Sequence, residues 1–257
     1  MINVEDFREA SLQLDNSLAE ANLISFPIRL QRAELAADIL SFSPVFREIH
    51  IKAVQDCVEQ TRLFNVLEAE NPIKHFDTLG EMQDNFTDKE SREKLDRYFD
   101  QSKQLMRMTD KSSASLRVGY KAFFYFIRTY HDSLYKTLLS IIRQQAGRAS
   151  AMTDTFDHKK KEFKLNNPVA QIIRTSYPDY INWFLSWREK RNAIKTGVGI
   201  AYIGPSYDLG ISFNKLNENG EFIPNFEVIR ITDVISALTA STKITSIAQK
   251  EVIHRIH

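Results

Sequence analysis

The longest segment without a helix-breaking residue is the feature that most restricts how this chain can fold. Between Ser112 and Ala146 the chain has one glycine, Gly119, and no proline. Large apolar residues recur through this segment at steps of three or four, the spacing of one face of an α-helix: Leu116, Tyr120, Phe123, Ile127, Tyr130, Leu134, Leu138 and Ile141. The pattern predicts a central helix of about 30 residues, or ~45 Å at ~1.5 Å per residue, covered on more than one side.

Glycine and proline are scarce and unevenly placed, which separates a helical part from a turn-rich part. The chain has only 8 glycines and 7 prolines, which is below average usage and favours a helical protein. Most glycines lie near the C-terminal third, where apolar runs at 198–203, 209–215 and 226–231 predict strands joined by turns. Thr232-Asp233 then caps a last amphipathic helix. We therefore predict a mainly α protein, a multi-helix bundle with a small antiparallel β-meander near the C-terminus followed by a final helix.

The first 110 residues predict further helices. Amphipathic segments at 3–22 and 28–40 indicate two of them, and Ser43-Pro44 offers an N-cap and a first-turn proline for a third that runs to about residue 68. We accordingly expect an N-terminal helical region at 1–110. A second helical domain at 111–257 is expected to contain the meander, at about 198–231, and the C-terminal helix.

Charge and cysteine content exclude several classes of protein. Lysine plus arginine number 34 and aspartate plus glutamate number 33, so binding of a polyanion must come from a local patch. The single cysteine, Cys57, excludes an internal disulfide and a multi-cysteine metal site. The N-terminus lacks a signal-peptide pattern, and the apolar runs are far shorter than the ~20 residues that span a bilayer. We expect a cytoplasmic protein without a membrane partner.

The sequence contains no common enzyme motif. It has no glycine-rich phosphate loop followed by Lys-Ser or Lys-Thr, no Gly-x-Ser-x-Gly elbow and no His-Glu-x-x-His helix. The six histidines are scattered along the chain. We therefore expect no metal site and no cofactor.

A predicted helix that ends near residue 196 carries the most informative polar pattern. Pro178 can occupy its first turn and Gly197 can end it. Two explanations of its cations remain open: they interact with the carbonyl end of their own helix or with acidic neighbours, or they form a binding site. The lysine-rich stretch 157–164 would join such a site only if the fold placed it beside this helix end. One face of the helix changes from apolar to cationic along the series Ile181, Phe184, Arg188, Arg191 and Lys195.

The segment 191–197, Arg-Asn-Ala-Ile-Lys-Thr-Gly, resembles the signature of the HEPN superfamily, and so does its place after a long aromatic-rich helix and before a hairpin and a final helix. That signature is an arginine, a small polar residue, three arbitrary residues and a histidine. Arg191 and Asn192 match its first two positions, Lys195 and Gly197 match its trailing context, and Thr196 stands in the histidine position. The resemblance implies a HEPN-like helical domain over residues 112 to about 250. Such domains are commonly dimeric, occur in prokaryotic defence and toxin–antitoxin systems, and often act as metal-independent ribonucleases.

Thr196 changes the chemistry that the resemblance implies. In HEPN ribonucleases the arginine is thought to hold the scissile phosphate while the histidine assists proton transfer, and a threonine hydroxyl is not a base at neutral pH. We therefore expect the protein to bind RNA or nucleotide through Arg191, Asn192 and Lys195, with Arg188 and Thr196 beside them. We expect little or no cleavage.

Two other functions remain open. One is a metal-independent endoribonuclease in which His131, on the long helix, supplies a displaced catalytic imidazole because the two helices pack side by side. The other is a helical protein–protein interaction or scaffold module without nucleic-acid activity. Arg128, His131, Asp132 and Lys136 interrupt the apolar surface of the long helix, either as a half-exposed flank with an Asp132–Lys136 pair or as a functional cluster. We expect a homodimer, with a further protein partner left open.

Overall fold

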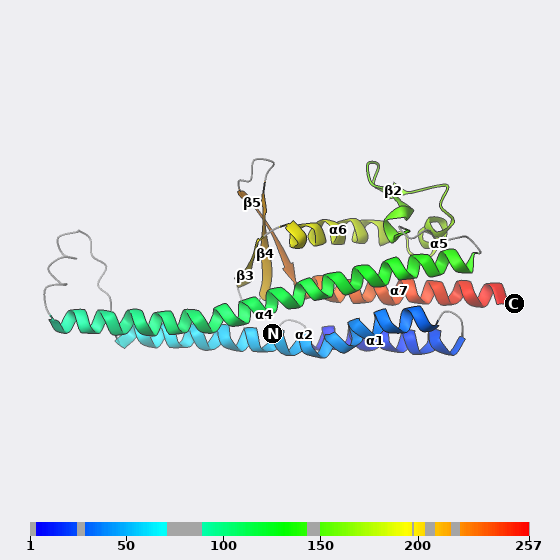
Figure 1. Cartoon of the computed structure of the whole chain (residues 1–257). Coiled ribbons are helices and arrows are strands. Elements are labelled where there is room, and N and C mark those ends of the chain that lie inside the picture. The colour runs from blue at the N-terminus through cyan, green and yellow to red at the C-terminus, as the bar shows by residue number, and fades with distance from the viewer. Residues whose placement is uncertain are drawn as a thin grey trace.

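The computed structural model is mainly helical, and most of its helices run along one long axis (Figure 1). It describes residues 4–24, 29–70, 89–142, 150–196, 198–203, 209–216 and 222–256. The predicted fold class, helices with a small antiparallel sheet before a final helix, is confirmed. In chain order the elements are α1 (Val4–Ile24), α2 (Arg29–Glu70), α4 (Lys89–Ile141), the single-turn helix η1 (Met152–Thr155), β1 (Phe156–Asp157), β2 (Glu162–Phe163), α5 (Pro168–Ser176), α6 (Tyr180–Thr196), β3 (Val198–Ile203), β4 (Leu209–Leu216), β5 (Phe222–Arg230) and α7 (Ile231–Ile256).

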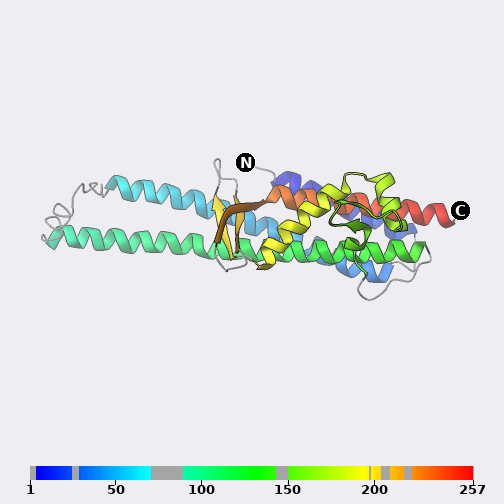
Figure 2. The same cartoon turned by 90° about the horizontal axis from the view of Figure 1, so that it is seen from above.

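Helix α4 is the central element, as predicted, but it begins well before Ser112. It has 53 residues, which corresponds to ~80 Å at ~1.5 Å per residue. Helix α2 lies antiparallel beside it, and one end of this pair extends beyond the other elements as a two-helix arm (Figures 1 and 2). Helices α1 and α7 cover the other half of the pair. The apolar row predicted from Leu116 to Leu138 is accordingly buried, and Ile141 is partly buried.

A cluster of aromatic rings holds α4 against α1 and α2. The ring of Phe46 on α2 lies 4.8 Å from Phe123 and 5.1 Å from Tyr120, measured between centroids. Phe7 on α1 completes the cluster, 5.6 Å from Phe46 and 5.7 Å from Phe123. A Cβ atom at Gly119 would lie 3.0 Å from Cδ2 of Phe46. The glycine in the middle of α4 therefore allows the Phe46 ring to approach the helix closely.

The helix start predicted at Ser43-Pro44 is wrong, because α2 continues through Pro44. Pro44 lacks a backbone N–H, so the helix loses one hydrogen bond at this position. The Ser43 hydroxyl donates to the Ile39 carbonyl at 2.8 Å, and Ile39 and Phe46 on either side are fully buried. Burial of these neighbours keeps the chain helical where local propensity predicts an end.

The regions expected at 1–110 and 111–257 share one hydrophobic core. Residue 110 lies inside α4. Helix α1 packs along α7, where the hydroxyl oxygens of Ser17 and Ser246 are 3.5 Å apart. Phe7 and Leu14 belong to the same buried cluster as Leu138 and Ala248. The N-terminal helices are thus part of the packing around α7.

The predicted meander is present as a three-stranded antiparallel sheet with the order β3-β4-β5. Val198 pairs with Asn214 and Ile203 with Leu209 in the first hairpin. Strand β5 begins at Phe222, earlier than predicted, and its register with β4 shifts between Asn214 and Lys215. Strands β1 and β2 form a separate two-stranded hairpin, which the sequence did not predict.

Candidate anion-binding site

Helix α6 carries the cationic residues and lies across α4 and α7 on one side of the molecule (Figures 1 and 2). It begins at Tyr180 rather than at Pro178, which lies in a turn after α5. Its predicted apolar face is buried at Ile181 and Phe184. The Trp187 ring stacks on Phe124 of α4 with centroids 3.6 Å apart, so α6 is fixed to α4 just before its cationic residues.

Arg128 of α4 lies beneath the cationic part of α6. Its Nε donates to Asp132 Oδ2 at 2.8 Å, and its guanidinium carbon lies 5.4 Å from the centroid of the Phe184 ring. Asp132 also accepts a hydrogen bond of 2.9 Å from the backbone N–H of Met152. Asp132 therefore forms an ion pair with Arg128 on its own helix and accepts a hydrogen bond from the start of η1.

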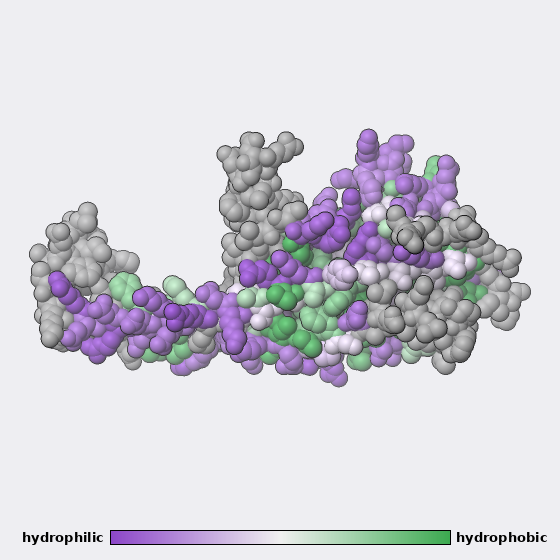
Figure 3. All heavy atoms as spheres, viewed as in Figure 1, coloured by the Kyte–Doolittle hydropathy of each residue, from purple (hydrophilic) through white to green (hydrophobic). Residues whose placement is uncertain are grey.

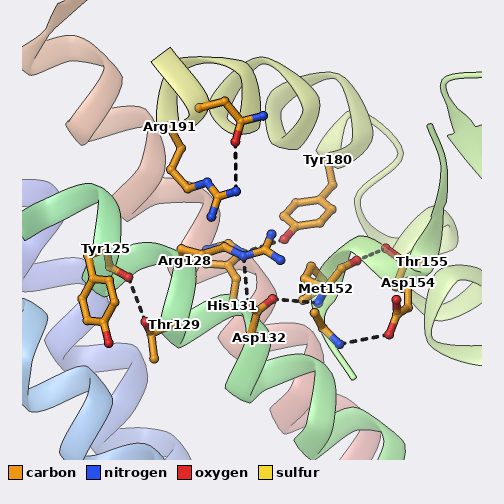
Figure 4. Close-up of polar contacts among 12 residues, drawn as sticks. Tyr125, Arg128, Thr129, His131, Asp132, Met152, Asp154, Thr155, Tyr180 and Arg191 are labelled. Carbon is orange, nitrogen blue, oxygen red and sulfur yellow. Dashed lines mark hydrogen bonds and ion pairs between the residues drawn. The ribbon is translucent and has the colours of Figure 1, made fainter. Parts of the chain in front are cut away.

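Arg191 points from α6 toward Arg128 (Figure 4). Its Nη2 donates to Asn192 Oδ1 at 2.9 Å, whereas its Nε is buried without a hydrogen-bond partner. Burial lowers the pKa of Arg191, and the positive charges of Arg128 and Arg188 lower it further. Within the part of the chain that the structure describes, no carboxylate forms an ion pair with Arg191. Arg191 thus retains an unused donor beside two like charges.

One residue of the lysine-rich stretch contacts the middle of α6, rather than its C-terminal end. His158, in the turn between β1 and β2, has its Nδ1 3.4 Å from Nη1 of Arg188. Burial lowers the pKa of His158, and so do the charges of Arg188 and Lys164. The surface over α6 and the β1–β2 hairpin is mainly hydrophilic (Figure 3). We refer to Arg128, Arg188, Arg191 and His158 as the arginine cluster.

His131 lies close to the cluster, but it is buried and 1% exposed. Its Nδ1 is 2.6 Å from the Tyr180 hydroxyl and its Nε2 is 2.9 Å from the Ser241 hydroxyl. Because Ser241 donates its single proton to the Ala237 carbonyl at 2.8 Å, Nε2 must donate to Ser241 and Nδ1 must accept from Tyr180. Burial, with a smaller effect of Arg128, lowers the pKa of His131 to about 3. Both nitrogens are occupied, and the imidazole stays neutral near pH 7.

The remaining predicted residues lie at the end of α6. Asn192 and Lys195 are exposed. Thr196 is the last residue of the helix, while its side chain and Gly197 lie outside the described residues. The structure thus brings Arg188, Arg191 and Asn192 together and keeps His131 inside the core.

Arg128 and His158 are members of the cluster that were not among the predicted binding residues. Arg128 precedes Asp132 by one helical turn, a spacing that indicates an ion pair on the helix surface. His158 belongs to the stretch 157–164, which was expected to be a solvated surface unless the fold placed it beside the cationic helix. The sequence gives no signal that these two residues meet α6, because both contacts join elements far apart along the chain.

The fold is mainly helical, and the arginine cluster is its candidate anion-binding site. Comparison with protein-family models, curated proteins and solved structures finds no match to this chain. In the described part of the chain, no helix has the length and apolar character needed to cross a membrane. No three His, Cys, Asp or Glu residues among the described residues are grouped as metal ligands.

Proposed function

We propose that the protein is HEPN-like, belongs to a prokaryotic defence or toxin–antitoxin system, and binds RNA or nucleotide at the arginine cluster without efficient cleavage. The observation that carries the proposal is the proximity of Arg128 and Arg188 to Arg191, with Asp132 paired to Arg128. The biological setting rests on the resemblance of residues 191–197 to the HEPN signature.

Charge supports an anion as the ligand. Arg128 and Asp132 neutralise each other, so Arg188 and Arg191 leave about two positive charges. The carbonyl end of α6 contributes only about half a negative charge, which does not offset two guanidinium groups. Guanidinium groups also match the geometry of phosphate oxygens better than ammonium groups do.

The surroundings of the two candidate catalytic positions favour binding over cleavage. Thr196 supplies no group that titrates near neutral pH. His131 is buried, and its low pKa and two hydrogen bonds remove it from exchange with a ligand. A ribonuclease that uses His131 is thus the less favoured proposal. Intact RNA after prolonged incubation with the pure protein would exclude it.

Replacement of Arg191 tests the binding proposal. We expect Arg191→Ala to weaken binding of a short single-stranded RNA about tenfold and to reduce the salt dependence of binding by about one unit of slope, because one phosphate contact is lost. Fluorescence anisotropy at several salt concentrations measures both quantities. Arg174→Ala is the matched control, since Arg174 is an exposed arginine on α5. Equal affinity of wild type and Arg191→Ala, or no salt-dependent binding by wild type, would refute the proposal.

The two-helix arm favours a second candidate function, a protein–protein interaction module whose partner is a second copy of this chain. Phe99 and Met106 on α4 are 49% and 55% exposed, and Val58 and Val66 on α2 are 42% and 43% exposed. Light scattering of wild type and of a Phe99→Ser, Met106→Ser variant tests this function. A dimer that persists in Arg191→Ala and dissociates in the double variant would support it, and a wild-type monomer would exclude it.

A further inference from the structure

His158 is the one member of the arginine cluster that is not an arginine, and burial together with the charges of Arg188 and Lys164 lowers the pKa of its imidazole. It lies on the β1–β2 hairpin, outside both helices that carry the arginines, and its side chain is exposed. The 3.4 Å contact from Arg188 Nη1 to His158 Nδ1 requires that Nδ1 carries no proton, because a guanidinium group can only donate. His158 is therefore neutral in this arrangement, and its ring faces the same space as Arg188.

The charges around the cluster match a dianion. The only carboxylate in contact with its arginines among the described residues, Asp132, is paired with Arg128. Arg188 and Arg191 leave two positive charges, whereas an internal phosphodiester of RNA carries one negative charge. A terminal phosphate has a second pKa near 6 and carries close to two negative charges at pH 7.5. Its third free oxygen can also accept a hydrogen bond that an internal phosphodiester cannot.

We propose that the arginine cluster binds a terminal phosphate group, a phosphomonoester, with Arg188 and Arg191 as fixed ligands and protonated His158 as an additional ligand. This inference rests on the proposed function and narrows its ligand to the end of an RNA strand or a mononucleotide. The hairpin β1–β2 brings His158 to the open side of the cluster, and Arg128 holds the inner side.

Binding of the dianion is coupled to uptake of a proton by His158. The groups that face the imidazole are Arg188 from α6, Arg128 from α4, Lys164 after β2, and Asp157 from its own hairpin. Three of these four groups are cations, which disfavour a proton on His158 in the free protein. A bound dianion compensates them and favours the protonated form, so affinity for a dianion of constant charge rises as the pH falls.

The first experiment compares one short oligoribonucleotide with a 5′-phosphate, with a 3′-phosphate, or with hydroxyl groups at both ends. At pH 7.5 we expect one phosphorylated form to bind about tenfold more tightly than the unphosphorylated form, because one additional charge-assisted contact is made. The form that gains affinity identifies which strand end is the source, and an equal gain for both forms identifies any terminal phosphate. Equal affinity of all three forms would overturn the inference.

The second experiment tests His158 with sulfate, which remains a dianion across the pH range used. Calorimetric titration of the full chain should show affinity for sulfate rising roughly fivefold between pH 8 and pH 6, and a flat profile in His158→Gln. The control is His254→Gln, an exposed histidine on α7, which should behave as wild type. A profile that is the same in His158→Gln and wild type would overturn the role of His158.

The two proposals can fail separately. If all three oligonucleotides bind equally while Arg191→Ala weakens their binding, the proposed function stands and only this inference fails. Absence of all binding refutes both.

Discussion

His131 is a buried imidazole whose two nitrogens have different hydrogen-bonding partners. The interpretation of this residue as a displaced catalytic group depended on the long helix packing side by side with the helix that carries Arg191. Its contacts with Tyr180 and Ser241 instead join α4 to α6 and α7. The residue thus contributes to the packing that places Arg128 below α6.

The depressed pKa of His131 predicts how stability depends on pH. The imidazole is neutral in the folded state down to a pH of about 3, whereas in the unfolded chain it gains a proton below a pH of about 6.5. Its contribution to stability is therefore complete above pH 6.5 and is lost as the pH falls from 6.5 toward 3. Between pH 7.5 and 5.5 we expect wild type to lose about 1 kcal/mol more unfolding free energy than His131→Gln, which cannot be protonated. Urea denaturation at both pH values measures this difference, and parallel pH profiles of the two proteins would contradict it.

The arginine cluster contains residues that the sequence predicts and residues that it does not. The cations at positions 188, 191 and 195 follow from helical spacing alone, because one helix face is a local property. Arg128 and His158 join the cluster through contacts between α4, α6 and the β1–β2 hairpin. No local pattern encodes such contacts, so the sequence analysis could name Arg128 and the stretch 157–164 only as alternatives and could not assign them to the site.

Helix α4 shows which features of an element are local and which depend on its neighbours. The apolar row from Leu116 to Leu138 predicted both the helix and its buried face. The continuity of α4 from Lys89 to Ile141 and the passage of α2 through Pro44 required knowledge of the packing. The Pro44 turn remains helical because the flanking side chains are buried in the aromatic cluster.

Gly119 provides a test of that cluster. In an isolated helix Gly119→Ala would stabilise by about 1 kcal/mol, but the added Cβ would lie 3.0 Å from the Phe46 ring. Phe7, Tyr120 and Phe123 surround this ring, so it cannot move away freely, and overpacking of this kind costs about 1–3 kcal/mol. We expect a net loss of about 1 kcal/mol in unfolding free energy, measured by chemical denaturation.

The variant Phe46→Leu, Gly119→Ala provides the control for this prediction. The smaller leucine leaves room for the added methyl group, so the double variant should lose less stability than the sum of the two single variants. Additive losses would show that the Phe46 ring does not determine the need for glycine.

At the scale of the whole molecule, α1 and α7 come from opposite ends of the chain and pack side by side. The sequence predicted both helices, but it also indicated a division at residue 110. Around residue 110 the amino-acid composition changes little and the helical spacing of apolar residues continues. Neither property indicates which helices are neighbours in space. The shared core, which contains Phe7 and Leu14 as well as Leu138 and Ala248, determines what part of the chain can fold independently.

A fragment of residues 111–257 should therefore fail to fold cooperatively. The fragment lacks α1 and α2, so the faces of α4 and α7 that these helices cover would be exposed. Phe123, which contacts both Phe7 and Phe46, lies on one of these faces. Each fully buried apolar side chain contributes about 1.5–3 kcal/mol through burial, and the loss of several exceeds the typical net stability of about 5–15 kcal/mol. Thermal melting followed by circular dichroism should show a broad, non-cooperative transition for the fragment and a cooperative one for the full chain. A sharp transition of the fragment at the temperature of the full chain would show that residues 111–257 form a domain without the N-terminal helices, and the cluster at α6 could then be studied in isolation.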